Sequence, residues 1–179
     1  LADQVTDYVE KHCPPELTVT ISYEQQLLGS AGTLAANRDF FGTQPFFIIY
    51  GDNLSDVDLA DLYASHIKHR PVLTLGTFEA EFPKRCGIAE IDQRQIIQGF
   101  VEKPEAPLSN RAAAGIYVAE PTIFDYFPES KNLSVLDLGF DVIPRLIGKM
   151  RNYSIDQLID IGTFESYQKA NGESQQGAH

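Results

Sequence analysis

Two aspartates lie directly after apolar, strand-like segments that are far apart in the sequence. Asp52 follows the apolar run 46–50, and Asp160 ends a second apolar segment that begins at Leu158. In an open α/β sheet, ligands bind beyond the carboxyl ends of the strands, so the two carboxylates are candidates for one shared site. Such a pair suits Mg²⁺, which takes few protein oxygens together with phosphates and water. The pattern predicts phosphoryl-type transfer, in which the ion neutralises charge on phosphate groups.

Two further polar segments follow predicted strands and extend the candidate site. The segment 102–104, Glu-Lys-Pro, comes directly after the strand-like segment 96–101. The segment 24–32 follows the alternating segment 18–23, begins with Glu24, and ends in a run of small residues. Because ligands bind at the carboxyl edge of such a sheet, polar groups at these positions are the ones to test for function.

Alternating strand and helix patterns would position these residues. Strands are expected where apolar runs or strict alternation occur, over residues 18–23, 46–50, 72–78, 87–91, 96–101, 113–119 and 158–161. Helical spacing predicts a first helix that Pro14 and Pro15 end, a short helix from Pro121, and helices over 34–41, 58–68, 136–147 and 164–171. The small residues of 29–32 are expected to form a turn.

The order of these elements indicates an α/β fold. The run 46–50 is typical of a strand buried on both faces of a parallel sheet, and with the helix 58–68 and the strand 72–78 it predicts a βαβ unit. At 179 residues, the chain is expected to form one domain over residues 1–171. The polar residues 172–179 are expected to be a flexible tail.

Composition and charge exclude several classes of function. The net charge of −11 and the pI near 4.7 repel nucleic acid and anionic lipid surfaces. No apolar run approaches the roughly 18 residues that span a bilayer, so a cytoplasmic protein is expected. Cys13 and Cys86 lack metal-ligand spacing and are too few for a disulfide framework, so both are expected to be reduced thiols without an assigned role.

Five motifs in register resemble one enzyme family. YEQQLLGSAGTL, YGDNL, GFVEKP, AAAGIYV and LIDIGT occur in this order. Together they are similar to the successive motifs of the sugar-1-phosphate nucleotidylyltransferases, and the similarity covers nearly the whole chain. Each motif alone is weak, because Gly-Asp after a strand is usually a turn and Glu-Lys-Pro is usually a solvated loop. The resemblance implies a Rossmann-like, three-layer α/β/α fold around a mixed, mainly parallel sheet that lacks the family's first strands.

The resemblance also implies roles for individual residues. Asp52 and Asp160 match the catalytic aspartates that bind Mg²⁺, and the substrates would be a nucleoside triphosphate and a sugar 1-phosphate. On the sugar side, Glu102 and Asn110 match residues that hold the sugar hydroxyls, Lys103 matches a contact to the sugar phosphate, and Gly115 matches a close backbone approach to the sugar. The residues assigned to nucleotide binding are Glu24, Gly29, Ser30 and Gly32.

Glu24 resembles the residue that reads the nucleobase in this family. A carboxylate only accepts hydrogen bonds, which suits the N1–H and N2–H₂ donors of guanine better than the mixed edge of uracil or thymine. We therefore expect GTP rather than UTP or dTTP, and a guanylyl transfer to mannose 1-phosphate or heptose 1-phosphate that releases pyrophosphate. The competing interpretation is that Glu24 is a surface residue after a strand.

The sequence departs from the family pattern at its start. Family members open with a glycine-rich loop containing an arginine, followed by Pro-Lys, and neither motif is present in the printed sequence. Since these groups wrap the triphosphate, the chain is expected to lack most triphosphate binding, and whether it is active or inactive alone stays open. Three explanations stay open: a truncated fragment, an enzyme completed by a partner chain or a homo-oligomer, or a member with another role.

Two other functions compete with nucleotidyl transfer. A glycosyltransferase of the GT-A type would use a DxD motif, which Asp56 and Asp58 supply, although both fit better as helix-cap charges. A non-catalytic nucleotide-binding or sugar-phosphate-binding module would bind without turnover.

His66 and His69 could bind a metal, but a solvated helix face is the favoured interpretation. Lys84 and Arg85 leave two interpretations open: they could contact a phosphate, or they could form a charge pair in a loop.

Overall fold

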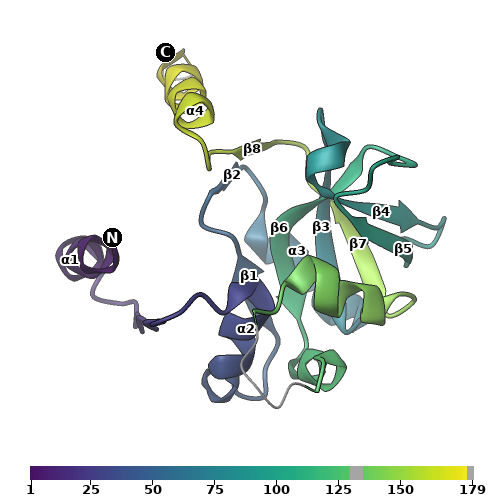
Figure 1. Cartoon of the computed structure of the whole chain (residues 1–179), viewed down its shortest axis with the longest axis horizontal. Helices are drawn as coiled ribbons and strands as arrows, with labels where there is room; N and C mark the ends of the chain where they lie inside the picture. The colour runs from purple at the N-terminus through teal and green to yellow at the C-terminus, as the bar shows by residue number, and fades with distance from the viewer. Residues whose placement is uncertain (130–134, 177–179) are drawn as a thin grey trace.

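The computed structural model describes residues 1–129 and 135–176 as an open mixed sheet with helices packed on its faces (Figure 1). The strands are β1 (Phe46–Ile49), β2 (Asn53–Ser55), β3 (Leu73–Glu79), β4 (Gly87–Ile91), β5 (Ile97–Glu102), β6 (Arg111–Ala119), β7 (Met150–Ser154) and β8 (Leu158–Asp160). The α-helices are α1 (Ala2–His12), α2 (Gly29–Ala36), α3 (Leu59–His69) and α4 (Phe164–Gln176). The short helical turns are η1 (Arg38–Phe40), η2 (Pro83–Arg85), η3 (Pro121–Tyr126), η4 (Leu138–Val142) and η5 (Ile143–Leu146).

The main sheet has the order β5-β4-β6-β3-β7, and β1 also pairs with β6. The expected mixed sheet is confirmed, but its expected parallel majority is not found, because β3 and β7 form the only parallel pair among the described residues. The reason is the position of β6. It runs antiparallel between β1 and β3, so the expected βαβ unit has a third strand inserted between its two parallel strands.

Strand β6 carries the core of both layers because its alternate residues point to opposite faces. Ile116 and Val118 pack with the buried Leu62 of α3 on one face. Tyr117 and Ala119 pack on the other face with buried residues of η3, η4 and η5. Helices therefore cover both faces of the sheet, which confirms the three-layer arrangement.

Two strands were missed by the sequence patterns. Strand β7 reads MRNYS and alternates buried Met150 and Asn152 with partly exposed residues, so its buried amide hides the apolar signal. Asn152 is accommodated because Thr77 Oγ1 donates a hydrogen bond to its side-chain oxygen over 2.5 Å. Strand β2 spans Asn53–Ser55 and pairs antiparallel with β8 as a separate two-stranded sheet.

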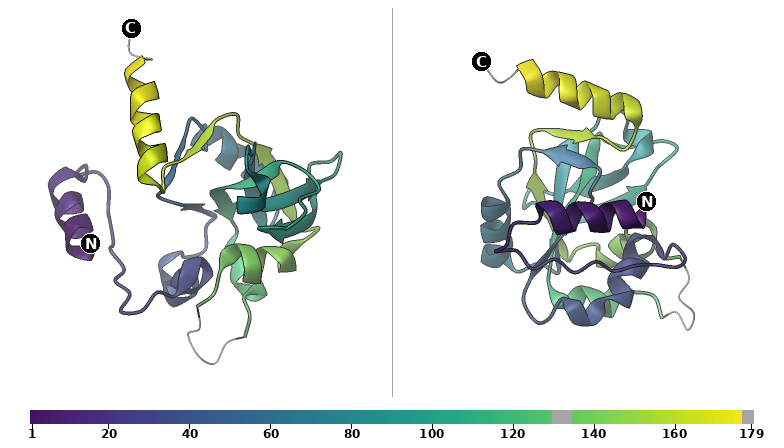
Figure 2. Two further views of the ribbon diagram at one scale, coloured as in Figure 1. Left: turned by 45° about the horizontal axis from the view of Figure 1, so that its top comes forward. Right: turned by 90° about the vertical axis from the view of Figure 1, so that its left-hand side faces the viewer.

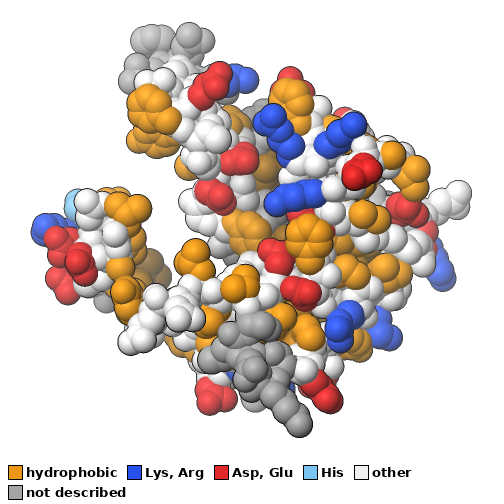
Figure 3. Space-filling view, viewed as in Figure 1, with side chains coloured by type: hydrophobic (Ala, Val, Ile, Leu, Met, Phe, Trp, Pro, Cys, Tyr) orange, Lys and Arg blue, Asp and Glu red, His pale blue; other side chains and the backbone are white. Residues whose placement is uncertain are grey.

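The amino-terminal arm, which we define as residues 1–28, stands away from the sheet (Figures 1 and 2). Helix α1 forms as predicted, yet it buries no residue, and Leu1 is 97% exposed. The predicted strand 18–23 is wrong: no strand of the described residues pairs with this segment, and a strand without a neighbour leaves its ladder groups unpaired. Figure 3 shows that the apolar side chains of α1 face the body across a gap while its charged side chains face outward.

The small residues 29–32 form the first turn of helix α2, so the isolated turn expected there is wrong. The helix also begins at Gly29, earlier than the start expected at residue 34. The amides of Ala31 and Gly32 donate to the carbonyl oxygen of Leu136 over 3.0 and 3.2 Å. Gly29 has φ of +76°, and a Cβ there would lie 2.4 Å from that same oxygen. Small side chains are needed because the helix start touches the backbone of a neighbouring segment.

The last helix, α4, extends to Gln176, five residues past the predicted end at 171, and so occupies most of the range expected to be tail. Figure 2 shows α4 projecting from the body near the β2–β8 sheet. None of the helices in the described part of the chain combines the length and the apolar character that crossing a bilayer requires.

Candidate active site

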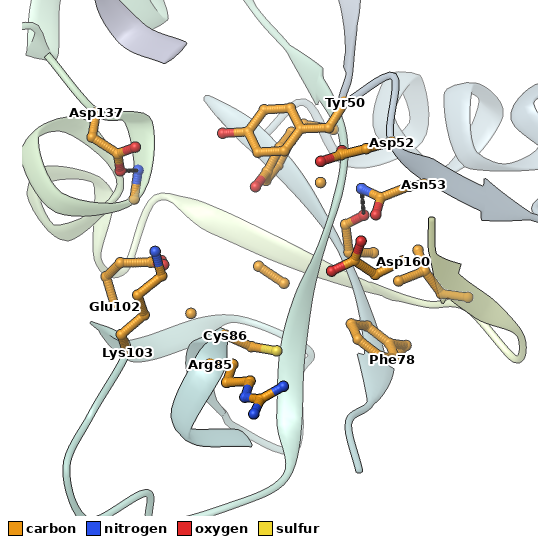
Figure 4. A pocket seen from close by; sticks show the side chains of 17 residues that line it. Tyr50, Asp52, Asn53, Phe78, Arg85, Cys86, Glu102, Lys103, Asp137 and Asp160 are labelled. Atoms are coloured by element: carbon orange, nitrogen blue, oxygen red, sulfur yellow. Dashed lines mark hydrogen bonds between the residues drawn. The ribbon is translucent and has the colours of Figure 1, made fainter. Parts of the chain in front are cut away.

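A pocket of about 300 Å³ opens at the carboxyl ends of β1, β3 and β5, beside the β2–β8 sheet (Figure 4). The predicted site residues that line it are Asp52, Glu102, Lys103, Gly115 and Asp160. They come from segments spread over most of the chain, so the fold alone brings them together. In Figure 4 the aspartate pair lies on one side of the pocket and Glu102 with Lys103 on the other.

The pairing of β2 with β8 brings the two aspartates together. Asn53 is the register partner of Asp160, and the amide of Ile161 donates to the main-chain oxygen of Asp52 over 2.8 Å. A Cβ built on Gly162 would lie 3.0 Å from Asp160 Oδ1 and 3.3 Å from Asp52 Oδ2. The two carboxylate oxygens are therefore no farther apart than the sum of these distances, which one cation and its bound waters can span.

The donor set fits a hard cation that is held mainly by its other ligands. Asp52 and Asp160 are exposed, and both supply oxygen. Among the side chains that the structure describes, in residues 1–129 and 135–172, no group of three or more His, Cys, Asp or Glu is arranged to hold a metal ion. Mg²⁺ commonly uses only one or two carboxylates and completes its shell with phosphate oxygens and water, so a pair is sufficient when a phosphorylated substrate is bound.

Gly115 shapes the pocket wall. Its φ is +66°, and a Cβ there would lie 2.4 Å from Asn53 Nδ2 and 3.0 Å from Tyr50 Cδ2. Asn53 Nδ2 donates to the carbonyl oxygen of Ala114 over 3.0 Å, and the amide of Tyr50 donates to that of Gly115 over 2.9 Å. These bonds tie the segment that carries Asp52 to β6, so only glycine fits at position 115.

The opposite wall is acidic and partly buried. A Cβ on Gly139 would lie 2.4 Å from Glu102 Oε2, so the Glu102 carboxylate lies against the start of η4. Burial, and then the charge of Asp137, raise the pKa of Glu102, while Lys103 opposes the shift. Lys103 itself is exposed and has φ of +48°, an unusual backbone for a lysine at a pocket rim.

Cys86 lies between the two carboxylate walls. Burial raises the pKa of its thiol, and the charges of Glu102 and Asp160 raise it further. The thiol is therefore neutral near pH 7 and is not a nucleophile. Its neighbour Arg85 also lines the pocket, with its guanidinium 5.4 Å from the centre of the Phe82 ring. The phosphate contact expected of Arg85 stays a prediction.

Sequence reasoning missed Tyr50 and Asp137 as pocket residues. Tyr50 directly precedes the predicted Asp52 segment, so its position at a strand end was an available signal. Asp137 gave no strand-end signal, because it is the N-cap of η4 and accepts hydrogen bonds from the amides of Gly139 and Phe140. Its other oxygen accepts from Ser30 Oγ over 3.2 Å. A helix cap becomes a pocket residue only through tertiary packing.

The residues predicted for nucleotide binding do not line this pocket. Glu24 Oε2 accepts a hydrogen bond from the amide of Leu28 over 3.0 Å, and Oε1 accepts one from Thr33 Oγ1. The bond from Thr33, then that from Leu28, lower the pKa of Glu24. The carboxylate is thus ionised near pH 7 and linked to helix α2, with one lone pair left on each oxygen.

The other predicted contacts lie beside the pocket. Gly29, Ser30 and Gly32 form the first turn of α2, which packs on the segment before η4. Ser30 Oγ accepts a hydrogen bond from the amide of Leu138 over 2.8 Å and donates one to Asp137. Ser30 therefore contacts a residue of the pocket wall without lining the pocket itself. Asn110 is exposed just before β6 and is outside the lining.

The structure also tests the competing motifs. Asp58 caps α3 and accepts hydrogen bonds from the amides of Ala60 and Asp61, as expected for a helix-cap charge. The solvated helix face expected for the two histidines is wrong for His66, whose side chain is fully buried and whose Nδ1 lies 2.8 Å from Thr74 Oγ1. Burial lowers the pKa of His66, so it is neutral near pH 7.

A family model described as nucleotidyl transferase matches residues 2–177, nearly the whole chain. The chain belongs to the nucleotidyl transferase family. The resemblance inferred from the five motifs is thereby confirmed, and the match includes the elements that form the pocket.

Several relatives in this family are named for one reaction. The mannose-1-phosphate guanyltransferase of Schizosaccharomyces pombe is 30% identical over 158 residues, which cover 84% of this chain and 42% of the relative. The mannose-1-phosphate guanylyltransferase catalytic subunit beta of Dictyostelium discoideum is 35% identical over 126 residues, which cover 68% of this chain and 34% of the relative. The chain therefore spans less than half the length of these two relatives.

Solved structures share the fold. A protein assigned as a glucose-1-phosphate thymidylyltransferase from Bacillus anthracis matches with a TM-score of 0.83 and 24% identity, covering 96% of this chain and 71% of that one. HddC from Yersinia pseudotuberculosis, solved with GMP-PN, matches with a TM-score of 0.76 and 23% identity, covering 96% of this chain and 74% of that one. At these identities the likeness establishes the family's Rossmann-like fold.

Proposed function

We propose that this chain carries the sugar-1-phosphate and metal half of a nucleotidyl-transfer site, in a reaction that joins GMP from GTP to mannose 1-phosphate and releases pyrophosphate. The observation that carries the proposal is the convergence of Asp52, Asp160, Glu102 and Lys103 on one pocket. That set suits this chemistry because it pairs oxygen ligands for a hard cation with a lysine that can contact phosphate.

The sugar would lie between Glu102 and the backbone at Gly115. Glu102 is half-buried and offers acceptor oxygens to sugar hydroxyls, while the absent Cβ at Gly115 keeps the wall open. Lys103 and Arg85 line the rim and supply the only lysine and arginine charges among the lining residues. A monoanionic or dianionic phosphate placed between them and the aspartate pair would be positioned to attack.

Asp52 and Asp160 would hold Mg²⁺, which supplies charge neutralisation between the attacking phosphate and the nucleotide phosphate. The chain's own residues need no nucleophile, because the sugar phosphate is already ionised at neutral pH. Their contribution is positioning. The β2–β8 pairing fixes the spacing of the two carboxylates, and Glu102 with Lys103 orients the acceptor.

The preference for GTP rests on Glu24. One lone pair on each of its oxygens is left after the bonds to Leu28 and Thr33, which is enough to accept from the two guanine donors. The names of the relatives from Schizosaccharomyces pombe and Dictyostelium discoideum support guanylyl transfer to mannose 1-phosphate as the reaction to test first.

Calorimetry of this chain with mannose 1-phosphate and Mg²⁺ tests the proposal, with mannose and with GTP as comparison ligands. We expect mannose 1-phosphate to bind only when Mg²⁺ is present, mannose to bind much more weakly, and GTP to bind weakly because the triphosphate-wrapping motifs are not in the sequence. Absence of any Mg²⁺-dependent binding of mannose 1-phosphate would overturn the proposal.

A pyrophosphate-release assay with GTP, mannose 1-phosphate and Mg²⁺ separates the remaining possibilities. Turnover by the chain alone would mean that other groups replace the expected phosphate loop. Binding without turnover would favour a non-catalytic sugar-phosphate module or an enzyme that a second chain completes. In both assays Asp52→Asn should lose the Mg²⁺-dependent signal. Asp125→Asn is its matched control, because Asp125 is an exposed aspartate of η3 that does not line the pocket.

A further inference from the structure

A second pocket, of about 400 Å³, lies at the opposite end of the sheet from the candidate active site. It opens at the amino ends of the parallel strands β3 and β7, whereas the active-site pocket begins at Phe78 near the carboxyl end of β3. We call it the basic pocket, because four of its lining residues are basic: His69, Arg70, Lys149 and Arg151. Val72 and Ile96 supply apolar wall between them.

The charge of the basic pocket is opposite to that of the chain. The chain has 25 acidic and 14 Lys and Arg residues, yet no acidic residue lines this pocket. Arg70 is paired with Glu120 over 2.9 Å. Lys149 and Arg151 form no ion pair with any carboxylate whose side chain the structure describes, in residues 1–129 and 135–172. The Lys149 ammonium lies 6.0 Å from the centre of the Tyr126 ring, which is a neutral partner. Two cations thus border a concave surface without a carboxylate partner.

The structural role of a helix end explains only part of this cluster. His69 is in the last turn of α3, where a basic side chain complements the helix dipole. Lys149 and Arg151 come from a different element, at the start of β7, and both residues line the same pocket. The charge of Arg151, after burial, contributes to lowering the pKa of His69, so the groups concentrate positive potential instead of dispersing it.

Side chains, and not backbone amides, are available to a ligand here. The amide of Val72 donates to the carbonyl of Lys149 over 3.0 Å, and the amide of Gly148 donates to that of Ile97 over 2.9 Å. Arg151 uses one guanidinium nitrogen to donate to the carbonyl of Arg94 over 2.9 Å, which fixes the group and leaves its other N–H donors. An anchored guanidinium fork suits the oxygens of a phosphate.

We propose that the basic pocket binds a small phosphate-bearing anion, at a site separate from the substrate pocket. The concave shape and the volume of the basic pocket suit a small molecule better than they suit the flat surface of a macromolecule. The net charge of −11 also opposes long polyanions, whose charge extends beyond the basic patch. This inference does not depend on the proposed function, because it uses none of the residues of the active-site pocket.

NMR titration of the whole chain with inorganic pyrophosphate tests the proposal, because amide signals report which pocket responds. We expect shifts at Val72, Gly148 and Arg151 that saturate, whatever happens at Gly115 and Gly162 in the active-site pocket. The double variant Lys149→Gln with Arg151→Gln should weaken binding at the basic pocket by about tenfold, since each solvent-accessible charge contact contributes about threefold. Lys149→Gln alone, at an exposed position, should weaken it about threefold or more even if the double variant folds poorly.

The matched control removes the same charge elsewhere, with Lys11→Gln and Arg145→Gln at two exposed positions outside the basic pocket. Its affinity should stay within about twofold, as expected when distant charges are screened by salt. Equal weakening in the control would mean a general field effect and would overturn the site. Shifts confined to the active-site pocket would also overturn it, and so would binding of an acidic peptide without any response to pyrophosphate.

Discussion

At the active-site pocket, Asp52, Asp160 and Glu102 lie on separate elements and line one shared volume, whereas Glu24 in the amino-terminal arm has both carboxylate oxygens bonded to its own neighbourhood. The first arrangement leaves acceptor groups for a ligand. The second uses one lone pair of each oxygen to fix the start of helix α2 and leaves one on each. The partners of each oxygen therefore show how much of a carboxylate's acceptor capacity serves folding and how much is left for a ligand.

The same two regions differ in burial. The sheet that supports the pocket contains fully buried residues such as Leu62, Leu73 and Val118. In the arm, large apolar side chains are exposed, including Leu17 at 60% and Leu27 at 84%. Folding energy from burial is therefore concentrated in the sheet, and changes in the two regions should have very different consequences for stability.

The largest expected effect comes from removing a core side chain. Leu62→Ala should lower the free energy of unfolding by about 2–5 kcal/mol, because a fully buried leucine leaves a cavity between α3 and β6. Val5→Ala in the arm should change it by less than about 0.5 kcal/mol, because Val5 is 55% exposed. Urea denaturation of both variants measures the contrast, and similar losses would mean that the arm packs against the body in solution.

The next effect concerns the metal. Asp52→Asn should weaken Mg²⁺-dependent binding of mannose 1-phosphate by more than about 100-fold, because an amide does not replace a charged ligand of a hard cation. Asp160→Asn should behave alike. Calorimetry with and without Mg²⁺ measures the loss, and the exposed positions of both aspartates should leave unfolding curves unchanged. Full Mg²⁺ dependence in either variant would remove that residue from the metal site.

A glycine comparison tests the pocket wall. Gly115→Ala should destabilise the fold by about 1–3 kcal/mol from its positive φ alone, and its Cβ would meet Asn53 and Tyr50. Gly51→Ala is the matched control, because a Cβ at Gly51 meets nothing within 4 Å. Thermal unfolding of the two variants distinguishes a strained wall from a tolerant one, and equal stability of both would show that the wall adapts.

The base preference provides a smaller effect in the arm. Glu24→Gln should shift the ratio of GTP to UTP affinity by about tenfold toward UTP, because a carboxylate accepts from both guanine donors and an amide does not. Glu16→Gln, at an exposed position in the same arm, should leave the ratio unchanged. An unaltered ratio in Glu24→Gln would leave that residue with a structural role only.

The smallest effect is a pH dependence at the opposite wall. The folded pKa of Glu102 is raised above its ordinary value of 4.5, so the charged form is disfavoured in the native state. The stability that Glu102 contributes is fully present below the pKa that it has in the unfolded chain. That stability is lost as pH rises through the pKa that Glu102 has in the folded chain. Glu102→Gln should therefore gain stability relative to the parent as pH rises from below 4.5 to neutrality, and parallel stability curves would contradict the raised pKa.

The sequence predicted the aspartate side of the pocket because the end of a strand can be recognised from local sequence. Asp52 and Asp160 follow apolar runs, and α/β topology places such ends at one edge. Asp137 could not be found this way, since it reaches the pocket as a helix cap through contacts with Ser30. The alternating segment 18–23 shows the opposite failure. Its pattern suits a strand, but pairing needs a neighbour that local sequence cannot supply.

The most direct test of the central claim, that Asp52 and Asp160 form a metal site for a phosphorylated sugar, is paramagnetic NMR with Mn²⁺ in place of Mg²⁺. With mannose 1-phosphate present, the account predicts line broadening of the amides of Asn53, Ile161 and Gly162, and its loss in Asp52→Asn. Broadening centred on Asp56 and Asp58 would contradict the account and would favour the DxD interpretation.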